Sequence, residues 1–162
     1  MKIINLYEGN CPLNIEKMIK KLLRNVPEEN MVGLHSIVIV NKSAQKNSID
    51  AAGLYIPQYK NELPRIEIAV DNVFFGLKRR YFFFPFIPKF IVARVLYHEI
   101  GHHYQFKHIR MKKVYQENYA KKFGSKMLKK ELFWWMFFLK PIVEVYGRSK
   151  GWETKSKKST AA

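Results

Sequence analysis

The sequence contains one cysteine and no long uninterrupted apolar run. With Cys11 as its only thiol, the chain cannot form an internal disulfide or a cysteine-based zinc site. Its longest uncharged apolar runs, residues 81–88 and 132–139, fall well short of the roughly 18 residues that a membrane-spanning helix needs. Residues 1–30 also lack the apolar core of a secretory signal peptide. These absences predict a cytoplasmic protein that does not span a membrane.

Acidic residues are scarce, since 29 basic residues face only 13 acidic ones and the formal net charge is +16. Such an excess attracts a chain to anionic surfaces. In residues 78–89 and 132–140 the basic residues are combined with runs of aromatic side chains. Such segments suit peripheral contact with an anionic membrane, mutual packing or a homo-oligomer interface, or substrate docking, and the sequence leaves these alternatives open. We find no specific nucleic-acid recognition module.

The chain of 162 residues has about the length of one domain, and 48% of its residues are hydrophobic. We therefore predict a single domain over residues 1–147, followed by a basic, flexible tail over residues 148–162. The spacing of apolar residues and the positions of the prolines predict the elements of the domain. They are a helix that begins after Asn14 and stops by Pro27, strands at 34–40, 52–56 and 65–70, a helix from Pro88 through His102, and a helix at about 114–130.

The segment His98-Glu99-Ile100-Gly101-His102 is the strongest functional signal in the chain. Because residues i and i+4 lie on one face of a helix, both histidines can bind the same metal ion. Zinc accepts imidazole nitrogens and keeps one position for water in catalytic sites. Glu99 follows the first histidine and is placed to take a proton from that water. The pattern predicts a catalytic zinc site.

A catalytic zinc ion needs a third protein ligand, and Glu117 is the first candidate. It lies fifteen residues beyond His102, on the predicted helix at 114–130. On that helix Glu117, Ala120, Phe123 and Met127 share one face. This face can pack on the helix of the two histidines, and the small Ala120 allows the helices to approach closely.

The second candidate is His108. Together with His98 and His102 it reproduces the ligand spacing of metzincins, which requires a sharp break after the second histidine, normally at a glycine. This chain has Gln105 there. If the helix continues instead, His108 points about 240° away from His102 around the helix axis. We therefore favour Glu117, and we interpret His103 and His35 as structural or surface residues.

Residues 34–130 resemble a minimal gluzincin, of the minigluzincin type and the related ImmA/IrrE-like peptidases. The residues that carry the resemblance are the segment from His98 to His102, then Glu117-x-x-Ala120-x-x-Phe123, together with the order of helix, three strands and active-site helix. The resemblance implies an α+β, zincin-like fold. Its sheet would be small, three-stranded and mostly antiparallel, with an active-site helix and a following helix that carries the third ligand.

The resemblance also implies the chemistry. His98, His102 and Glu117 would bind one Zn²⁺ per chain, and Glu99 would act as general base and acid in the hydrolysis of a peptide or protein substrate. One strand, which we expect to be that at residues 65–70, would pair with the extended substrate. Some minigluzincins are latent because a terminal segment occludes the cleft, and residues 132–152 are the candidate for that role here.

The competing class is a non-catalytic metal-binding module. In such a protein the metal would be structural, and the basic and aromatic surface would bind a membrane, nucleic acid or a protein partner. The presence of Glu99 favours the enzyme, because a structural site has no need of a carboxylate beside its first ligand.

Overall fold

The computed structural model of the chain describes residues 1–43, 50–108 and 115–131. Residues Met1–Leu128 form one compact unit and Lys129–Ala162 a second one. The first unit contains the sheet and the helices that precede residue 109. The expected domain boundary at residue 147, the tail beyond it and the aromatic segment at 132–140 lie outside the described residues, as does the segment at 132–152 considered for latency.

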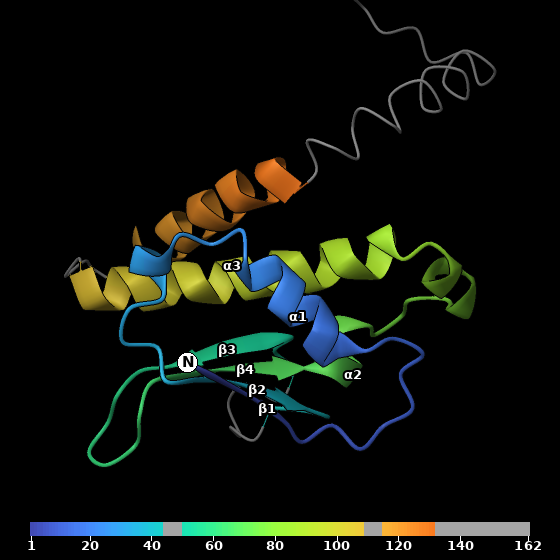
Figure 1. Cartoon of the computed structure of the whole chain (residues 1–162), viewed down its shortest axis with the longest axis horizontal. Coiled ribbons are helices and arrows are strands. Elements are labelled where there is room, and N and C mark those ends of the chain that lie inside the picture. The colour runs from blue at the N-terminus through green and yellow to red at the C-terminus, as the bar shows by residue number, and fades with distance from the viewer. Residues whose placement is uncertain (44–49, 109–114, 132–162) are drawn as a thin grey trace, which may run out of the picture. The chain divides into compact units, whose positions relative to one another are not determined.

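The described strands form one mixed sheet in the order β1-β2-β4-β3, in an α+β fold (Figure 1). The strands are β1 (Lys2–Asn5), β2 (Ser36–Val40), β3 (Gly53–Ile56) and β4 (Arg65–Ala69). β2 is parallel to both β1 and β4, and only β3 is antiparallel to its neighbour. The prediction of a three-stranded, mostly antiparallel sheet was therefore wrong. β1 is only four residues long, and its apolar and polar residues do not alternate, so the sequence carried no strand signal there. The chain returns from β1 to β2 through helix α1, and such a crossover makes the pairing of the two strands parallel.

β3 is the last strand at one side of this sheet, next to β4. The prediction that the strand at residues 65–70 pairs with substrate was wrong, because β4 is bonded to β2 on one side and to β3 on the other. Arg65 and Glu67 are charged residues of the kind that edge strands often carry, but contacts with distant segments place β4 between β2 and β3. The described sheet has two edge strands, β1 and β3. Of these, β3 is the one that contacts α3, so its edge is the candidate for pairing with a substrate.

The helices follow the sequence-based prediction closely. In α1 (Ile15–Leu23) the side chain of Asn14 accepts a hydrogen bond from the backbone N–H of Lys17 at 2.8 Å, which caps the helix as expected. α3 (Phe86–His108) begins two residues before Pro88 and includes His98 and His102. Residues 115–131 are also helical. The other short elements are η1 (Glu28–Asn30), α2 (Val70–Val73) and η3 (Arg79–Phe83).

α1 and α3 cover one face of the sheet (Figure 1). α3 has buried apolar residues on several sides because α1, the sheet and the 115–131 helix surround it, and Val92, Leu96 and Ile100 are among its fully buried residues. The hydroxyl of Tyr97 donates a hydrogen bond to the carbonyl of Leu22 at 3.2 Å, which joins α3 to the end of α1. The helix that carries the two histidines is thereby fixed in the core.

Candidate metal centre

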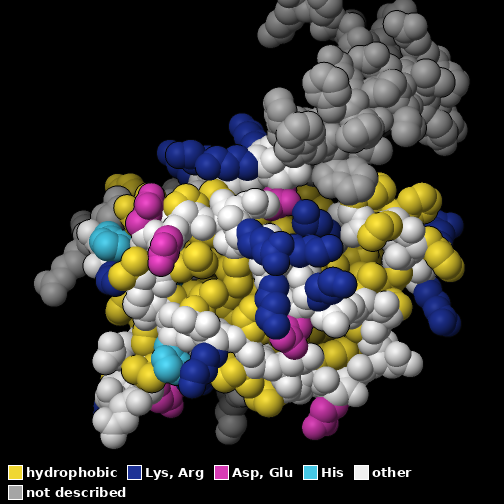
Figure 2. All heavy atoms as spheres, viewed as in Figure 1, with side chains coloured by type: hydrophobic (Ala, Val, Ile, Leu, Met, Phe, Trp, Pro, Cys, Tyr) yellow, Lys and Arg dark blue, Asp and Glu magenta, His cyan; other side chains and the backbone are white. Residues whose placement is uncertain are grey.

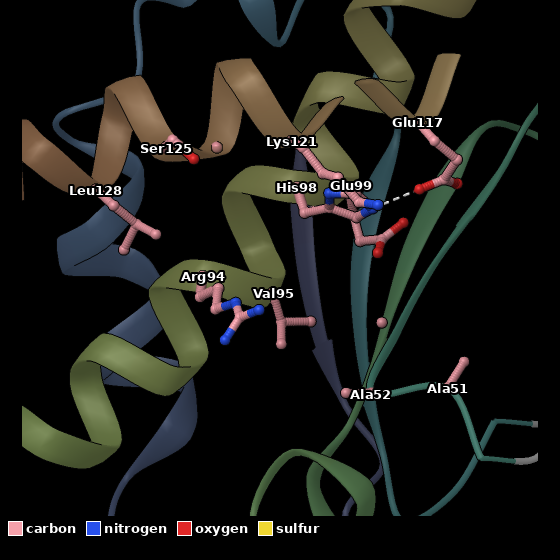
Figure 3. Close-up of a pocket in the computed structure, with 12 residues that line it drawn as sticks. Ala51, Ala52, Arg94, Val95, His98, Glu99, Glu117, Lys121, Ser125 and Leu128 are labelled. Carbon is pink, nitrogen blue, oxygen red and sulfur yellow. Dashed lines mark ion pairs between the residues drawn. The ribbon is translucent and has the colours of Figure 1, made fainter. Parts of the chain in front are cut away.

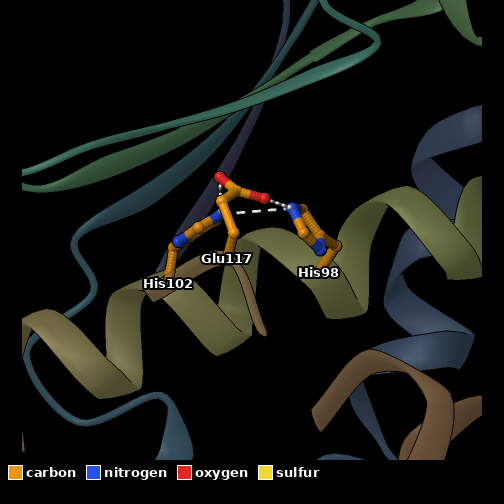
Figure 4. A group of neighbouring side chains, drawn as sticks. All are labelled: His98, His102 and Glu117. Atoms are coloured by element: carbon orange, nitrogen blue, oxygen red, sulfur yellow. Dashed lines mark hydrogen bonds and ion pairs between the residues drawn. The ribbon is translucent and has the colours of Figure 1, made fainter. Parts of the chain in front are cut away.

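Three side chains that can bind a metal ion meet between two helices (Figure 4). His98 and His102 lie one turn apart on one face of α3, and Glu117 extends toward them from the 115–131 helix. Glu117 Oε2 is 3.6 Å from His98 Nε2, and its Oε1 is 3.3 Å from His102 Nε2. The two Nε2 atoms are 3.1 Å apart. The structure therefore brings together the three side chains that the sequence nominated as ligands.

The spacing of these donor atoms suits one tetrahedrally coordinated ion. Ligand atoms at about 2.0–2.1 Å from such an ion are about 3.3–3.4 Å from each other. The two imidazole nitrogens are 3.1 Å apart, each has a different oxygen of Glu117 within 3.6 Å, and one ligand atom from each of the three residues lies within 4.8 Å of the others. Two imidazole nitrogens with one carboxylate oxygen also form a ligand set that leaves a fourth position for water. The side chain of Glu117 is 54% exposed, so the group is accessible from solvent. The residues present fit a divalent metal ion such as zinc.

Small residues allow the two helices to cross closely at this point. A Cβ atom on Gly101 would lie 2.9 Å from the Cα of Ala120, and a Cβ atom on Gly124 would lie 3.4 Å from the backbone nitrogen of His98. Ala120 is fully buried. The close approach expected at Ala120 is confirmed. Gly101 on α3 and Gly124, one turn after Ala120 on its own helix, extend the contact. This short distance between the helices lets Glu117 reach both imidazoles.

Replacing Gly101 with alanine should destabilise the protein by about 1–3 kcal/mol, because the new methyl group meets the backbone of Ala120. Elsewhere in a helix the same change stabilises by roughly 0.5–1 kcal/mol. A destabilised Gly101→Ala protein would therefore indicate that the two helices cross closely at this residue. Urea unfolding measures the effect, with the exposed Ser125→Ala on the facing helix as control. A Gly101→Ala protein as stable as the wild type contradicts the close crossing.

Glu99 is buried beside the three candidate ligands and is bonded to the sheet. Its Oε2 accepts a hydrogen bond from the backbone N–H of Tyr55, on β3, at 2.9 Å. Burial raises the pKa of Glu99 to about 7; the hydrogen bond from Tyr55 opposes this rise and the negative charge of Glu117 adds to it. A carboxyl group with this pKa can both accept and release a proton near neutral pH.

β3 approaches α3 closely because Gly53 has no side chain. A Cβ atom there would lie 2.5 Å from Cγ1 of Val95 and 2.9 Å from Cγ of Glu99. In an antiparallel ladder, successive residues direct their backbone groups to opposite sides. Because the carbonyl of Ala52 accepts a hydrogen bond from β4, the backbone groups of Gly53 and Tyr55 point away from β4. The bond from Tyr55 to Glu99 agrees with this orientation. The open edge of β3 therefore borders the site.

Both candidate histidine ligands favour their neutral form. Burial lowers the pKa of His98, the charge of His102 lowers it further, and Glu117 raises it. Lys121 and Arg94 add smaller effects that also lower the pKa of His98. Burial likewise lowers the pKa of His102, again opposed by Glu117. A neutral imidazole has the free lone pair that a metal ion requires.

His108 does not join the group. α3 continues without a break to His108, whose ring packs on Tyr104 with the ring centroids 4.6 Å apart. Among the described residues, the potential metal ligands that lie together are His98, His102 and Glu117. The continuation of the helix through Gln105 places His108 on another face, which is the outcome expected without a glycine at that point.

His103 has a structural role, as predicted from the sequence. It is buried, with Nε2 3.2 Å from the carbonyl of Val32 and Nδ1 3.2 Å from the hydroxyl of Tyr55. Because the carbonyl can only accept, Nε2 carries the proton and the Tyr55 hydroxyl donates to Nδ1. Burial raises the pKa of Tyr55 to about 12, so its hydroxyl stays protonated. His103 thus helps to hold the residue whose backbone binds Glu99.

Two cavities flank the candidate ligands in the described part of the chain. The larger, of about 630 Å³, is drawn in Figure 3 and lies beside Arg94, Lys121 and Leu128. The smaller, of about 390 Å³, lies beside Tyr55 and Phe106. Both are also lined by Gly53, His98, Glu99 and Glu117. A chain that occupied both cavities would therefore pass next to the ligand group and Glu99.

No protein family, curated protein or solved structure gives a match to this chain. Its function is accordingly inferred from its own residues and from their geometry.

Sequence reasoning missed several residues of the site. Gly53 lies inside a strand-like run, where a glycine often marks the close approach of another element, and that signal was available. The backbone role of Tyr55 has no sequence signature, because any residue except proline can donate that hydrogen bond. Arg94 and Lys121 are each one helical turn from a candidate ligand, so the helical period could have placed them beside it.

Proposed function

We propose that the protein is a zinc-dependent peptidase of the gluzincin type, with a zincin-like arrangement of active-site helix, third-ligand helix and edge strand. The observation that carries this proposal is the convergence of His98, His102 and Glu117, whose ligand atoms lie within 4.8 Å of one another, beside the buried carboxyl of Glu99. A purely structural metal site would not require that carboxyl group or an open cleft on either side.

Zinc, when bound, polarises the peptide carbonyl and makes water a stronger acid. Glu99 supplies the proton transfers. It accepts a proton from the attacking water as the water oxygen bonds to the carbonyl carbon, and it passes this proton to the amide nitrogen as the carbon–nitrogen bond breaks. The products are a carboxylic acid and an amine, which at neutral pH are a carboxylate and an ammonium group. The hydrogen bond from Tyr55 holds one oxygen of Glu99, so the other is free to take the proton.

The open edge of β3 suits an extended peptide. Gly53 and Tyr55 direct their backbone groups to this edge, and an extended chain can bind there as an additional strand. The N–H of Tyr55 is already engaged by Glu99, which leaves the backbone groups of Gly53 and the carbonyl of Tyr55 for the substrate. A peptide bound in this way would lie across both cavities, with a peptide bond next to Glu99.

Zinc content and proteolysis, measured on one preparation, test the proposal. The wild-type protein should contain one zinc ion per chain by elemental analysis and should cleave unfolded casein. A wild-type protein that takes up no zinc after reconstitution contradicts the proposal. If zinc is bound but casein is not cleaved, the non-catalytic module becomes the better explanation.

A second candidate function, contact with an anionic membrane, is favoured by one surface. Phe75 and Phe83 are 90% and 82% exposed, Phe84 is also exposed, and residues 78–80 next to them are Lys-Arg-Arg. We call these six residues the aromatic-basic patch. Residues 72–98 contain no acidic residue. Hydrophobic and basic side chains gather at the right of Figure 2, the end at which α3 begins in Figure 1.

Among the described residues no helix is long and apolar enough to cross a membrane, so the proposed contact is peripheral.

Mutation of this patch should weaken binding to vesicles of phosphatidylcholine and phosphatidylserine. Burying a phenylalanine contributes about 1.5–3 kcal/mol, so the double variant Phe75→Ser, Phe83→Ser should bind at least roughly a hundredfold more weakly in flotation assays. Tyr59→Ser, which alters an exposed aromatic residue in the turn between β3 and β4, is the control. Equal flotation of the three proteins, or none by the wild type, contradicts membrane contact through this patch.

A further inference from the structure

We propose that the larger cavity beside the candidate metal centre is a carboxylate-binding subsite. It would select peptides that carry an acidic side chain, or a free C-terminal carboxylate, just beyond the bond to be cleaved. This inference rests on the proposed peptidase function and adds the class of substrate.

Two basic side chains line this cavity, one from each helix that supplies ligands (Figure 3). Arg94 lies one turn before His98 on α3, and Lys121 lies one turn after Glu117 on the facing helix. Each therefore shares the helix face of a candidate ligand. Because both residues line the same cavity, the two positive charges fall on the same side of the ligand group.

These positive charges are not neutralised by the protein in the described residues. The acidic side chains that line the cavity are Glu99 and Glu117, and both are engaged. Glu117 directs its oxygens to the two imidazoles, and Glu99 accepts the Tyr55 N–H. No ion pair joins Arg94 or Lys121 to an acidic side chain within residues 1–43, 50–108 and 115–131. A bound carboxylate would supply the missing negative charge, and arginine can bind both of its oxygens.

The cavity also has room and partly apolar walls. Gly53 and Gly124 line it without side chains, and Val95 and Leu128 contribute apolar surface. Its volume of about 630 Å³ exceeds the space that one glutamate side chain needs. Arg94 and Lys121 are both exposed, so their attraction for a carboxylate is partly screened by solvent and depends on the salt concentration.

The smaller cavity, on the other side of the ligand group, has a different character. It is lined by aromatic and neutral polar residues, among them Tyr55, Phe106 and Gln116, and by no lysine or arginine. The two sides of the proposed cleavage site therefore differ in charge. A substrate that spans both cavities would be selected for a carboxylate on one side only.

The direction of β3 indicates which side this is. The larger cavity lies at residues 51–53, where β3 begins, and the smaller one extends to Pro57, just beyond its end. Antiparallel pairing is slightly more stable per residue than parallel pairing. A peptide that pairs antiparallel to β3 runs from Pro57 toward residue 51, so the part that follows the cleaved bond enters the larger cavity.

Binding to the zinc-loaded Glu99→Gln protein tests the subsite without requiring hydrolysis. The probes are a blocked alanine hexapeptide with a glutamate at its centre, the same peptide with glutamine, and an alanine tetrapeptide with a free or an amidated C-terminus. Titration calorimetry should show about tenfold tighter binding of an acidic form than of its neutral partner. The hexapeptide pair tests recognition of a side-chain carboxylate, and the tetrapeptide pair tests recognition of a C-terminal carboxylate. Repeating the titrations on metal-free protein excludes direct binding of the carboxylate to zinc.

Variants assign the preference to the two basic side chains. Arg94→Met and Lys121→Met should each reduce the ratio of acidic to neutral binding several-fold, and Lys121→Glu should favour a lysine-containing peptide. Lys122→Met removes an exposed charge from the same helix, outside the cavity, and should leave the ratio unchanged. High salt should reduce the ratio in the wild-type background as well.

Cleavage of a peptide mixture by the wild-type protein then locates the carboxylate. Mass spectrometry should show aspartate, glutamate or the chain end enriched immediately after the cleaved bond. Acid-selective binding without any cleavage supports the subsite and counts against the peptidase. Cleavage without an acidic preference, a preference only before the cleaved bond, or a binding ratio that survives both methionine substitutions overturns the proposed subsite.

Discussion

Replacing Glu99 with glutamine is expected to lower kcat for peptide hydrolysis by about 10²–10⁴-fold while zinc content remains one ion per chain. Glutamine keeps the shape of the side chain and an oxygen that can accept the N–H of Tyr55. It cannot take a proton from water, so the chemical step loses its base. Casein hydrolysis and elemental analysis on the same preparation measure both quantities.

The exposed Glu29→Gln is the control for this variant, because it makes the same change in charge far from the cleft. It should retain wild-type activity. Thermal unfolding of both variants shows whether the fold is preserved. If Glu99→Gln cleaves casein as fast as the wild type, Glu99 is not the base and the proposed mechanism fails.

Replacing Glu117 with alanine is expected to weaken zinc binding by at least about a hundredfold, whereas His108→Ala should leave it unchanged. Loss of partners that merely orient a ligand already weakens binding by about 10–100-fold, and Glu117 is proposed as a ligand itself. His108 packs on Tyr104, away from the group. Competition with a chromogenic chelator measures the affinities.

The two variants together decide between the candidates for third ligand. The opposite result, weak zinc binding by His108→Ala and normal binding by Glu117→Ala, would require α3 to break after His102. Because a bound ion stabilises only the folded state, zinc should also raise the Tm of the wild type and of His108→Ala. It should raise the Tm of Glu117→Ala much less at the same zinc concentration.

The sequence by itself determined the local features of this protein. The spacing of His98 and His102 placed both imidazoles on one helix face, and Asn14 marked the start of α1. The choice of Glu117 over His108 followed from the helical period and from the absence of a glycine at position 105. The helix start at Asn14, the shared face of the two histidines and the continuation of α3 through Gln105 follow the sequence because each depends on interactions within a few turns of the chain. The choice of Glu117 over His108 as a metal ligand stays a prediction.

Only the tertiary structure decided which strands are neighbours and what surrounds the site. The parallel pairing of β1 and β2, and the edge position of β3, arise from contacts between distant segments that leave no periodic trace in either strand. The bond from Tyr55 to Glu99 uses a backbone group that nearly every residue possesses. Arg94 and Lys121 are ordinary basic residues in the sequence, and they line one cavity because the crossing at Gly101 and Ala120 brings their helices together.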